Sequence, residues 1–179
     1  VEDDDGDAVL VGELLREVGA AVVVQRARSL TQAKALVSGA ACVLLSSEEF
    51  ARTRGWKILA YLTFSETAAV DFVGMAGPRE GMLMAPAYAV PRMLERAGLT
   101  LQDFDFYEIH EAFAAQVLCT LKAWESEEYC RSRLQRNSAL GKIDRAKLNP
   151  KGSSVAIGHP FAATGARIVA TLAKQLAER

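Results

Sequence analysis

The first forty-five residues alternate between amphipathic stretches and short apolar runs. Apolar positions at helical spacing predict helices over residues 8–18 and 29–37. The runs "AAVVV" and "AACVLL" that follow them predict short buried strands. Because strands and helices alternate, we expect an α/β protein with a parallel sheet and helices on the faces of that sheet.

The alternation continues to the end of the chain. Ser46 and Glu49 have the spacing of a capping box and predict a helix that ends near Arg54. Further helices are expected from Pro86 to Gly98, after residue 111 and after residue 160, and strands over 57–73, 103–109 and 153–158. The expected apolar helix faces comprise Val90, Met93, Leu94 and Ala97; Phe113, Val117, Leu121 and Trp124; and Ile168, Leu172 and Leu176. Residues 125–148 are rich in charge and predict a surface insertion with some helix.

Composition narrows the class of protein. The 179 residues are half apolar, carry a net charge of −1 and contain no apolar run of membrane-spanning length. We therefore expect neither nucleic acid nor a membrane as a partner. The opening "VEDDDGD" is acidic, unlike a secretory leader, and the three cysteines have no CxxC spacing. These features favour a cytoplasmic location.

The two histidines of the chain occupy matching positions. His110 and His159 each follow an expected strand and precede an expected helix. Ligands of α/β sheets bind at the carboxyl ends of strands, and histidine titrates near neutral pH, so it can act as a base. A histidine at a helix start can equally have a packing or capping role, but two at equivalent junctions favour a site. Gly158 would let a ligand approach closely, and Pro160 would fix the chain direction after His159.

Two longer motifs carry these histidines. The segments "HEAFAAQ" and "NPKGSSVAIGHPFAATGARI" resemble the C-terminal half of thiolases, the coenzyme A-dependent acyltransferases, and in particular the HEAF branch that includes the 3-ketoacyl-CoA thiolases. The resemblance runs from about Gly39 to Arg179 and departs from the family at Ser153, where a second glycine is usual. It implies a layered α/β half-fold and a homodimer. It also implies thiolysis of 3-ketoacyl-CoA, or the reverse Claisen condensation to form it, with coenzyme A as substrate and no permanently bound cofactor.

The resemblance also assigns roles to individual residues. It implies that His159 activates a nucleophilic cysteine and helps to form an oxyanion hole, and that His110 positions a water for that hole. We expect Gly158, Pro160 and Phe113 to contact coenzyme A. The family's two catalytic cysteines belong to an N-terminal half and to a CxGGG loop, neither of which is found in this sequence. We therefore expect this chain to be inactive in isolation.

A second resemblance covers the N-terminal quarter. "VEDDDGDAVLVGELLREVG", with the strand, helix and "CVLL" that follow, resembles the front of a flavodoxin-like response-regulator receiver domain. It implies a Mg²⁺ site at Glu2 and Asp3, although these acids are also typical of a solvated turn. Ser46 stands where that family has its phosphate-accepting aspartate. The two resemblances divide the chain into a receiver-like part, 1–45, and a thiolase-like part, 46–179, and leave a phosphorelay receiver or a non-catalytic engineered chimera as alternatives.

Overall fold

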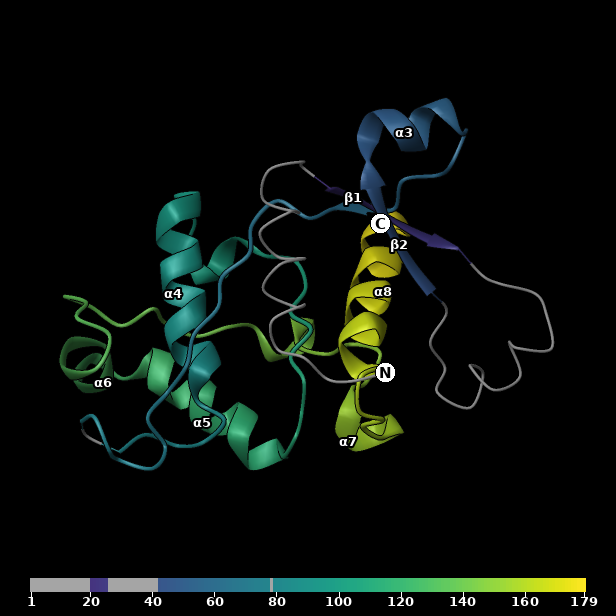
Figure 1. Ribbon diagram of the computed structural model, residues 1–179. Helices are drawn as coiled ribbons and strands as arrows, with labels where there is room; N and C mark the ends of the chain where they lie inside the picture. Colours follow the sequence, from purple (N-terminus) through teal and green to yellow (C-terminus); the bar gives the residue numbers. More distant parts are fainter. Residues whose placement is uncertain (1–19, 26–41, 78) are drawn as a thin grey trace. The chain divides into compact units, whose positions relative to one another are not determined.

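The computed structural model describes residues 20–25, 42–77 and 79–179 (Figure 1). These residues form two compact units. The terminal unit combines the described residues up to Ser65 with Ile157–Arg179, and the central unit comprises the described residues of Glu66–Ala156. Within the described ranges, no helix is long and apolar enough to cross a membrane.

The terminal unit contains a three-stranded sheet. Strands β1 (Ala20–Gln25), β2 (Cys42–Ser47) and β3 (Ala60–Tyr61) lie in the order β2-β1-β3, with β1 antiparallel to both neighbours. The prediction of a parallel sheet is therefore wrong, because both hydrogen-bonded strand pairs, β1–β2 and β1–β3, are antiparallel. Because β2 and β3 both oppose β1, they share one direction, and the helix α3 lies between them in the sequence. The expected strand-helix-strand unit thus exists, but β1 separates its two strands.

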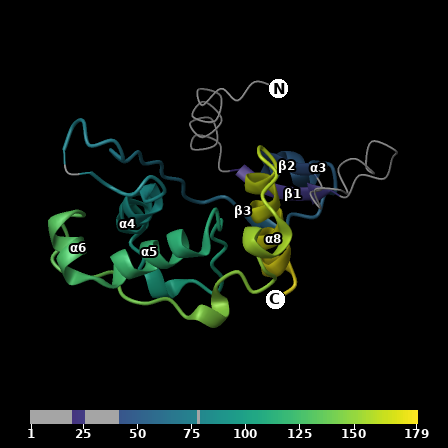
Figure 2. The same cartoon turned by 90° about the horizontal axis from the view of Figure 1, so that it is seen from below.

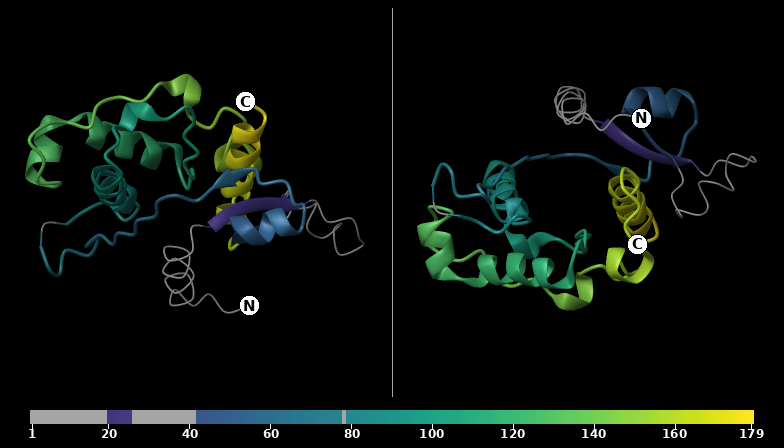
Figure 3. Two further views of the ribbon diagram at one scale, coloured as in Figure 1. Left: turned by 90° about the horizontal axis from the view of Figure 1, so that it is seen from above. Right: turned by 60° about the horizontal axis from the view of Figure 1, so that its bottom comes forward.

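Two helices pack on this sheet. Helix α3 (Glu48–Thr53) and helix α8 (Thr164–Ala177) lie on opposite sides of β1 (Figure 3). Helix α3 begins one residue later than predicted, because the Ser47 side chain, not that of Ser46, accepts the capping hydrogen bond from the Phe50 N–H at 3.2 Å. The Ser46 hydroxyl instead donates to the Ser47 carbonyl at 3.1 Å. The predicted end of this helix near Arg54 is confirmed.

The buried face of α8 differs from the predicted stripe. Leu176 is 43% exposed, and Ile168 and Leu172 are half-buried. Ala170 and Ala173, at 8% and 2% exposure, are buried, as are Thr164, Arg167 and Gln175 of the same helix. Small side chains let a helix approach a sheet closely, so the alanine face packs inward and the larger aliphatic residues lie at its margin.

The central unit is built on three helices, α4 (Ala85–Ala97), α5 (Ala114–Glu125) and α6 (Glu127–Ser132) (Figures 1 and 2). The predicted limits of α4 are confirmed, with Pro86 in its first turn and Gly98 at a left-handed φ of 65° as its C-cap. The core residues are Leu94, Leu101, Val117, Leu121, Trp124 and Ile143. The charged segment 125–148 is more than a surface insertion, because it buries Cys130 and Ile143.

Three predicted strands are wrong in whole or in large part. Of residues 57–73, only Ala60–Tyr61 pairs in the sheet. Residues 103–109 follow a 3-10 turn (Leu101–Asp103) and make a single parallel bridge, from Tyr107 to Leu148, just after a second 3-10 turn (Arg145–Lys147). Residues 153–158 contain a helical turn, α7 (Ser154–Ile157). An apolar run of strand length forms a strand only where a ladder partner is available.

Candidate active site

His159 lies on an open, tightly turned loop that leads into α8. Gly158 has a φ of 91°, and a Cβ built there would meet no atom within 4 Å. Ala162 also adopts a left-handed φ of 63°, which costs free energy for a residue with a Cβ. These two positions turn the chain sharply on either side of His159, whose side chain is exposed. The space at Gly158 is open, and the close approach of a ligand there stays a prediction.

A buried threonine orients the imidazole of His159. The Nδ1 atom lies 2.8 Å from the Oγ1 atom of Thr164, the first residue of α8. The Thr164 hydroxyl donates its one proton to the Pro160 carbonyl at 3.1 Å. It must therefore accept from His159, so the neutral imidazole carries its proton on Nδ1 and its lone pair on Nε2. That tautomer is the one in which Nε2 can accept a proton from a substrate or nucleophile.

Phe161 and Pro160 complete this loop. The ring of Phe161 meets the His159 ring edge to face, with the ring centroids 4.9 Å apart, and is itself 83% exposed. Pro160 acts on His159 through its carbonyl, which anchors the Thr164 hydroxyl. The sequence does not predict Thr164 as a site residue, because a threonine among alanines and glycines gives no sign that its hydroxyl is buried.

His110 lies in the central unit, where residues 107–111 run beside residues 147–155. Its Nδ1 atom lies 2.8 Å from the Ser154 Oγ atom. Asn149 joins the two segments beside this contact, although its φ is 46°, a left-handed value that asparagine tolerates better than most residues. The Asn149 side chain accepts from the Ile109 N–H at 2.8 Å and donates to the Ile109 carbonyl at 2.9 Å.

Glu111 also joins these two segments, and its hydrogen bonds together with those of Asn149 form a clasp around His110. One carboxylate oxygen accepts from the Asn149 side chain at 2.9 Å, and the other accepts from the Val155 N–H at 3.0 Å. These contacts give Glu111 a structural role, because they hold the helical turn α7 (Ser154–Ile157) against the segment around His110. Ser153, which is 1% exposed, donates to the Ile109 carbonyl at 3.2 Å. The sequence motif contains Asn149 and Ser153, but residue type alone does not show that they hold Ile109, the neighbour of His110.

The remaining predicted site residues have separate outcomes. His110 and His159 belong to different units, so the prediction that they belong to one site stays a prediction. Phe113 is the N-cap of α5 and is 68% exposed, so its predicted place on the packed face of that helix is wrong, and its contact with coenzyme A stays a prediction. Glu2 and Asp3 lie outside the described residues. Within the described ranges, no three histidine, cysteine or acidic side chains are grouped as a metal site.

Comparison with known proteins decides the family. The profile of the family described as "Thiolase, C-terminal domain" matches residues 63–179, well over half of the chain. The chain belongs to the thiolase family. The "Probable 3-ketoacyl-CoA thiolase" of Caenorhabditis elegans is 39% identical over 180 residues, which cover 99% of this chain and 39% of that protein. The "3-ketoacyl-CoA thiolase" of Pectobacterium atrosepticum is 46% identical over 144 residues, or 80% of this chain and 32% of the relative.

Solved thiolases share the fold. The dimeric peroxisomal thiolase of Saccharomyces cerevisiae is 38% identical with a TM-score of 0.53, over 74% of this chain and 28% of that one. Human mitochondrial 3-ketoacyl-CoA thiolase, also solved in complex with CoA, is 30% identical with a TM-score of 0.55, over 76% of this chain and 29% of that one. The predicted thiolase-like α/β half-fold and the resemblance to the C-terminal domain of 3-ketoacyl-CoA thiolases are confirmed. The thiolase chain described here spans between a quarter and two fifths of the length of these relatives.

Proposed function

We propose that this chain supplies the histidine-bearing C-terminal domain of a thiolase that cleaves 3-ketoacyl-CoA with free coenzyme A, or runs the reverse condensation. The observation that carries the proposal is the hydrogen-bond relay from His159 through Thr164 to the Pro160 carbonyl, because it leaves the Nε2 lone pair of His159 able to take a proton. Relatives named 3-ketoacyl-CoA thiolase and the human relative in complex with CoA support the choice of substrate.

In the proposed reaction, Nε2 of His159 accepts the proton of a cysteine thiol. The thiolate adds to the 3-keto carbon, and the bond between carbons 2 and 3 then breaks. The departing carbanion takes up a proton and leaves as acetyl-CoA, while the acyl group stays on the sulfur until the thiol of free coenzyme A removes it. We assign neither Cys119 nor Cys130 of the central unit to this nucleophile, so we expect the isolated chain to show no thiolysis.

A hybrid enzyme tests the proposal. Residues 42–179 of this chain would replace the matching segment of the Pectobacterium 3-ketoacyl-CoA thiolase, which is 46% identical over 144 residues. The purified hybrid is expected to cleave acetoacetyl-CoA in the presence of coenzyme A. Loss of the base in His159→Ala is expected to lower kcat by about 10²–10⁴-fold.

The matched control is Arg79→Gln, an exposed change in the loop between β3 and α4. Its activity should equal that of the parent hybrid. A folded hybrid without thiolysis, or a His159→Ala hybrid as active as its parent, would overturn the proposed function.

His110 and the predicted coenzyme A contacts belong to the same proposal. We assign His110 to water positioning, supported by its hydrogen bond to Ser154, and Gly158, Pro160 and Phe113 to contact with coenzyme A. The open space at Gly158 and the 68% exposure of Phe113 support that contact. In the hybrid, His110→Asn should retain more activity than His110→Ala, because an amide can still hold a water. Phe113→Ala should raise the KM for coenzyme A.

Assembly and location are proposed on other grounds. We propose a homodimer, supported by the dimeric peroxisomal thiolase of yeast. Light scattering of the hybrid should give the mass of two chains, and a monomer would contradict the proposal. A cytoplasmic location rests on the cysteine pattern of the sequence.

The receiver interpretation of residues 1–45 and the domain boundary after residue 45 stay predictions. The worm relative aligns with 99% of the chain, and its alignment therefore extends into this segment and favours a single thiolase origin over a chimera. The Mg²⁺ ligands Glu2 and Asp3 depend on the receiver interpretation. Incubation with acetyl phosphate and Mg²⁺ tests it, because an acid-labile phosphoryl group on the chain would support a receiver.

A further inference from the structure

A groove in the central unit has the chemistry of an anion site. It encloses about 720 Å³ between α4 and the segment that follows α6. Its charged lining comprises Arg92, Arg133 and Arg136 against a single carboxylate, Glu95. We propose that this groove binds a small anion that carries a diphosphate group. The proposal does not depend on thiolase activity.

Arg136 is the strongest reason for an anionic ligand. Its backbone N–H donates to the Cys130 carbonyl at 2.9 Å, which fixes it just beyond the end of α6. Gln135 immediately before it has a left-handed φ of 54° and turns the chain there. The Nε atom of Arg136 is buried and has no hydrogen-bond partner within the part of the chain that the structure describes. The rest of the Arg136 guanidinium lines the groove, where its terminal N–H groups can pair with phosphate oxygens.

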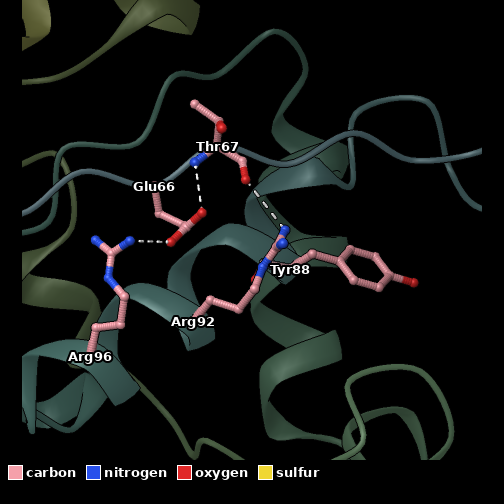
Figure 4. A network of polar contacts seen from close by, with 5 residues as sticks. All are labelled: Glu66, Thr67, Tyr88, Arg92 and Arg96. Carbon is pink, nitrogen blue, oxygen red and sulfur yellow. Dashed lines mark hydrogen bonds and ion pairs between the residues drawn. The ribbon is translucent and has the colours of Figure 1, made fainter. Parts of the chain in front are cut away.

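Arg92 contributes a second cation that is already held in position. Its Nε atom donates to the Tyr88 carbonyl at 3.1 Å and its Nη2 atom to the Thr67 carbonyl at 3.3 Å (Figure 4). Both acceptors are neutral, so these bonds orient the guanidinium without cancelling its charge. Arg96, one turn later on α4, differs because it is 2.8 Å from the Glu66 carboxylate.

Arg133 adds a weaker contribution. Its positive charge also interacts with the Glu80 carboxylate, which partly neutralises it. The polar side chains of Gln135, Asn137 and Ser138 line the same groove and offer further donors. Arginine recognises phosphate oxygens through paired N–H groups, and two such forks suit a diphosphate better than a single monoanion. The cavity volume falls within the range of ordinary small-molecule sites.

Titration calorimetry with inorganic pyrophosphate tests the proposal on the full 179-residue chain. We expect one saturable site. Arg136→Gln should weaken binding by about tenfold or more, and Arg136→Lys, which keeps the charge but loses the paired N–H groups, should also weaken it. Glu95→Gln removes the only carboxylate of the lining and should strengthen binding. This gain cannot arise from misfolding, so it keeps the test informative if the arginine variants are unstable.

The matched control is Arg131→Gln, an exposed arginine of α6 that does not line the groove. It should bind pyrophosphate as the parent does. Equal weakening in Arg131→Gln and Arg136→Gln would reduce the effect to general surface charge and overturn the proposal, as would the absence of saturable binding. A parallel titration with ADP identifies the source of the diphosphate: tighter binding of ADP indicates a nucleotide, and equal binding indicates the diphosphate alone.

Discussion

The imidazole of His159 is tied to Thr164, five residues later, by a 2.8 Å contact between Nδ1 and Oγ1. Thr164 is 4% exposed and its hydroxyl is committed to the Pro160 carbonyl. The loop that presents the histidine therefore also sets its tautomer. Within the thiolase proposal, Thr164 is a positioning residue, since it acts through His159.

The first prediction removes this contact in the hybrid enzyme. Thr164→Val keeps the shape of the side chain but loses the hydroxyl, so His159 is no longer held in one tautomer and orientation. The loss of one oriented hydrogen bond, about 1 kcal/mol, should lower kcat by about five- to tenfold with little change in KM. The pH profile of kcat should shift as well, and Thr164→Ser should restore most of the activity.

Steady-state kinetics with acetoacetyl-CoA measure this effect, and urea unfolding monitors stability. A purely structural threonine would lower stability without changing the pH profile. Unchanged kinetics in a folded Thr164→Val hybrid would remove the positioning role.

The sequence identified the histidines because both stand in long motifs beside helix starts. It did not identify their supports, because a small polar residue looks alike whether it is exposed or buried. Thr164 and Ser153 each lie among alanines, glycines and serines, and only the fold shows that their hydroxyls are buried and bonded to Pro160 and Ile109. Such contacts depend on chain geometry that residue type does not encode.

The fold shows the same division. Helix limits marked by local chemistry, such as Gly98 after α4, were predicted correctly because capping depends on adjacent residues. The direction of the strands was predicted wrongly, since an apolar run has the same sequence pattern whether the neighbouring strand is parallel or antiparallel. The sequence predicts a strand over 153–158 because small residues fit a strand and a helical turn equally well. Its contacts with Ile109 and Glu111, more than forty residues earlier in the chain, are part of a helical turn instead.

The second prediction concerns Asn149, which is 8% exposed and bonds both backbone groups of Ile109 as well as Glu111. Asn149→Ala should lower the free energy of unfolding by about 2–4 kcal/mol, because buried backbone groups lose their partners. Asn149→Gly loses the same bonds but accepts the left-handed φ, so it should be about 1 kcal/mol more stable than the alanine variant. Urea unfolding measures both. Asn137→Ala, at an exposed site, should have the same free energy of unfolding as the parent. If Asn149→Ala is equally stable, Asn149 does not hold the two segments together.

The third prediction uses the acid dependence of stability. Glu80 accepts hydrogen bonds from the hydroxyls of Tyr88 at 2.6 Å and Tyr129 at 2.8 Å. Partial burial raises the pKa of Glu80, but these hydrogen bonds outweigh it and the net pKa lies below the ordinary 4.5. A carboxyl with a lowered folded pKa stabilises the protein above its unfolded pKa and loses that contribution as the pH falls through the folded value.

Glu80→Gln should therefore be less stable than the parent at neutral pH, and the gap should narrow as the pH is lowered past 4.5. Urea unfolding at a series of pH values gives this difference directly. Glu128→Gln, an exposed carboxylate change on α6, should show no such narrowing. A gap for Glu80→Gln that stays constant through the acid range would exclude an ionised Glu80 as the stabilising partner of the two tyrosines.

The fourth prediction addresses Ser153, where the thiolase resemblance of the sequence motif leads us to expect a glycine. Ser153 is 1% exposed, has no left-handed backbone to relieve, and donates to the Ile109 carbonyl. Ser153→Ala should lower the free energy of unfolding by about 0.5–1.5 kcal/mol through loss of that bond. Ser153→Gly, although it restores the residue usual in the family, should cost about 0.5–1 kcal/mol more, because glycine adds backbone freedom to the unfolded chain. Exposed Ser138→Ala provides the control in urea unfolding. A glycine variant more stable than the parent would mean that the serine is merely tolerated there, and that the bond to Ile109 contributes nothing to the clasp around His110.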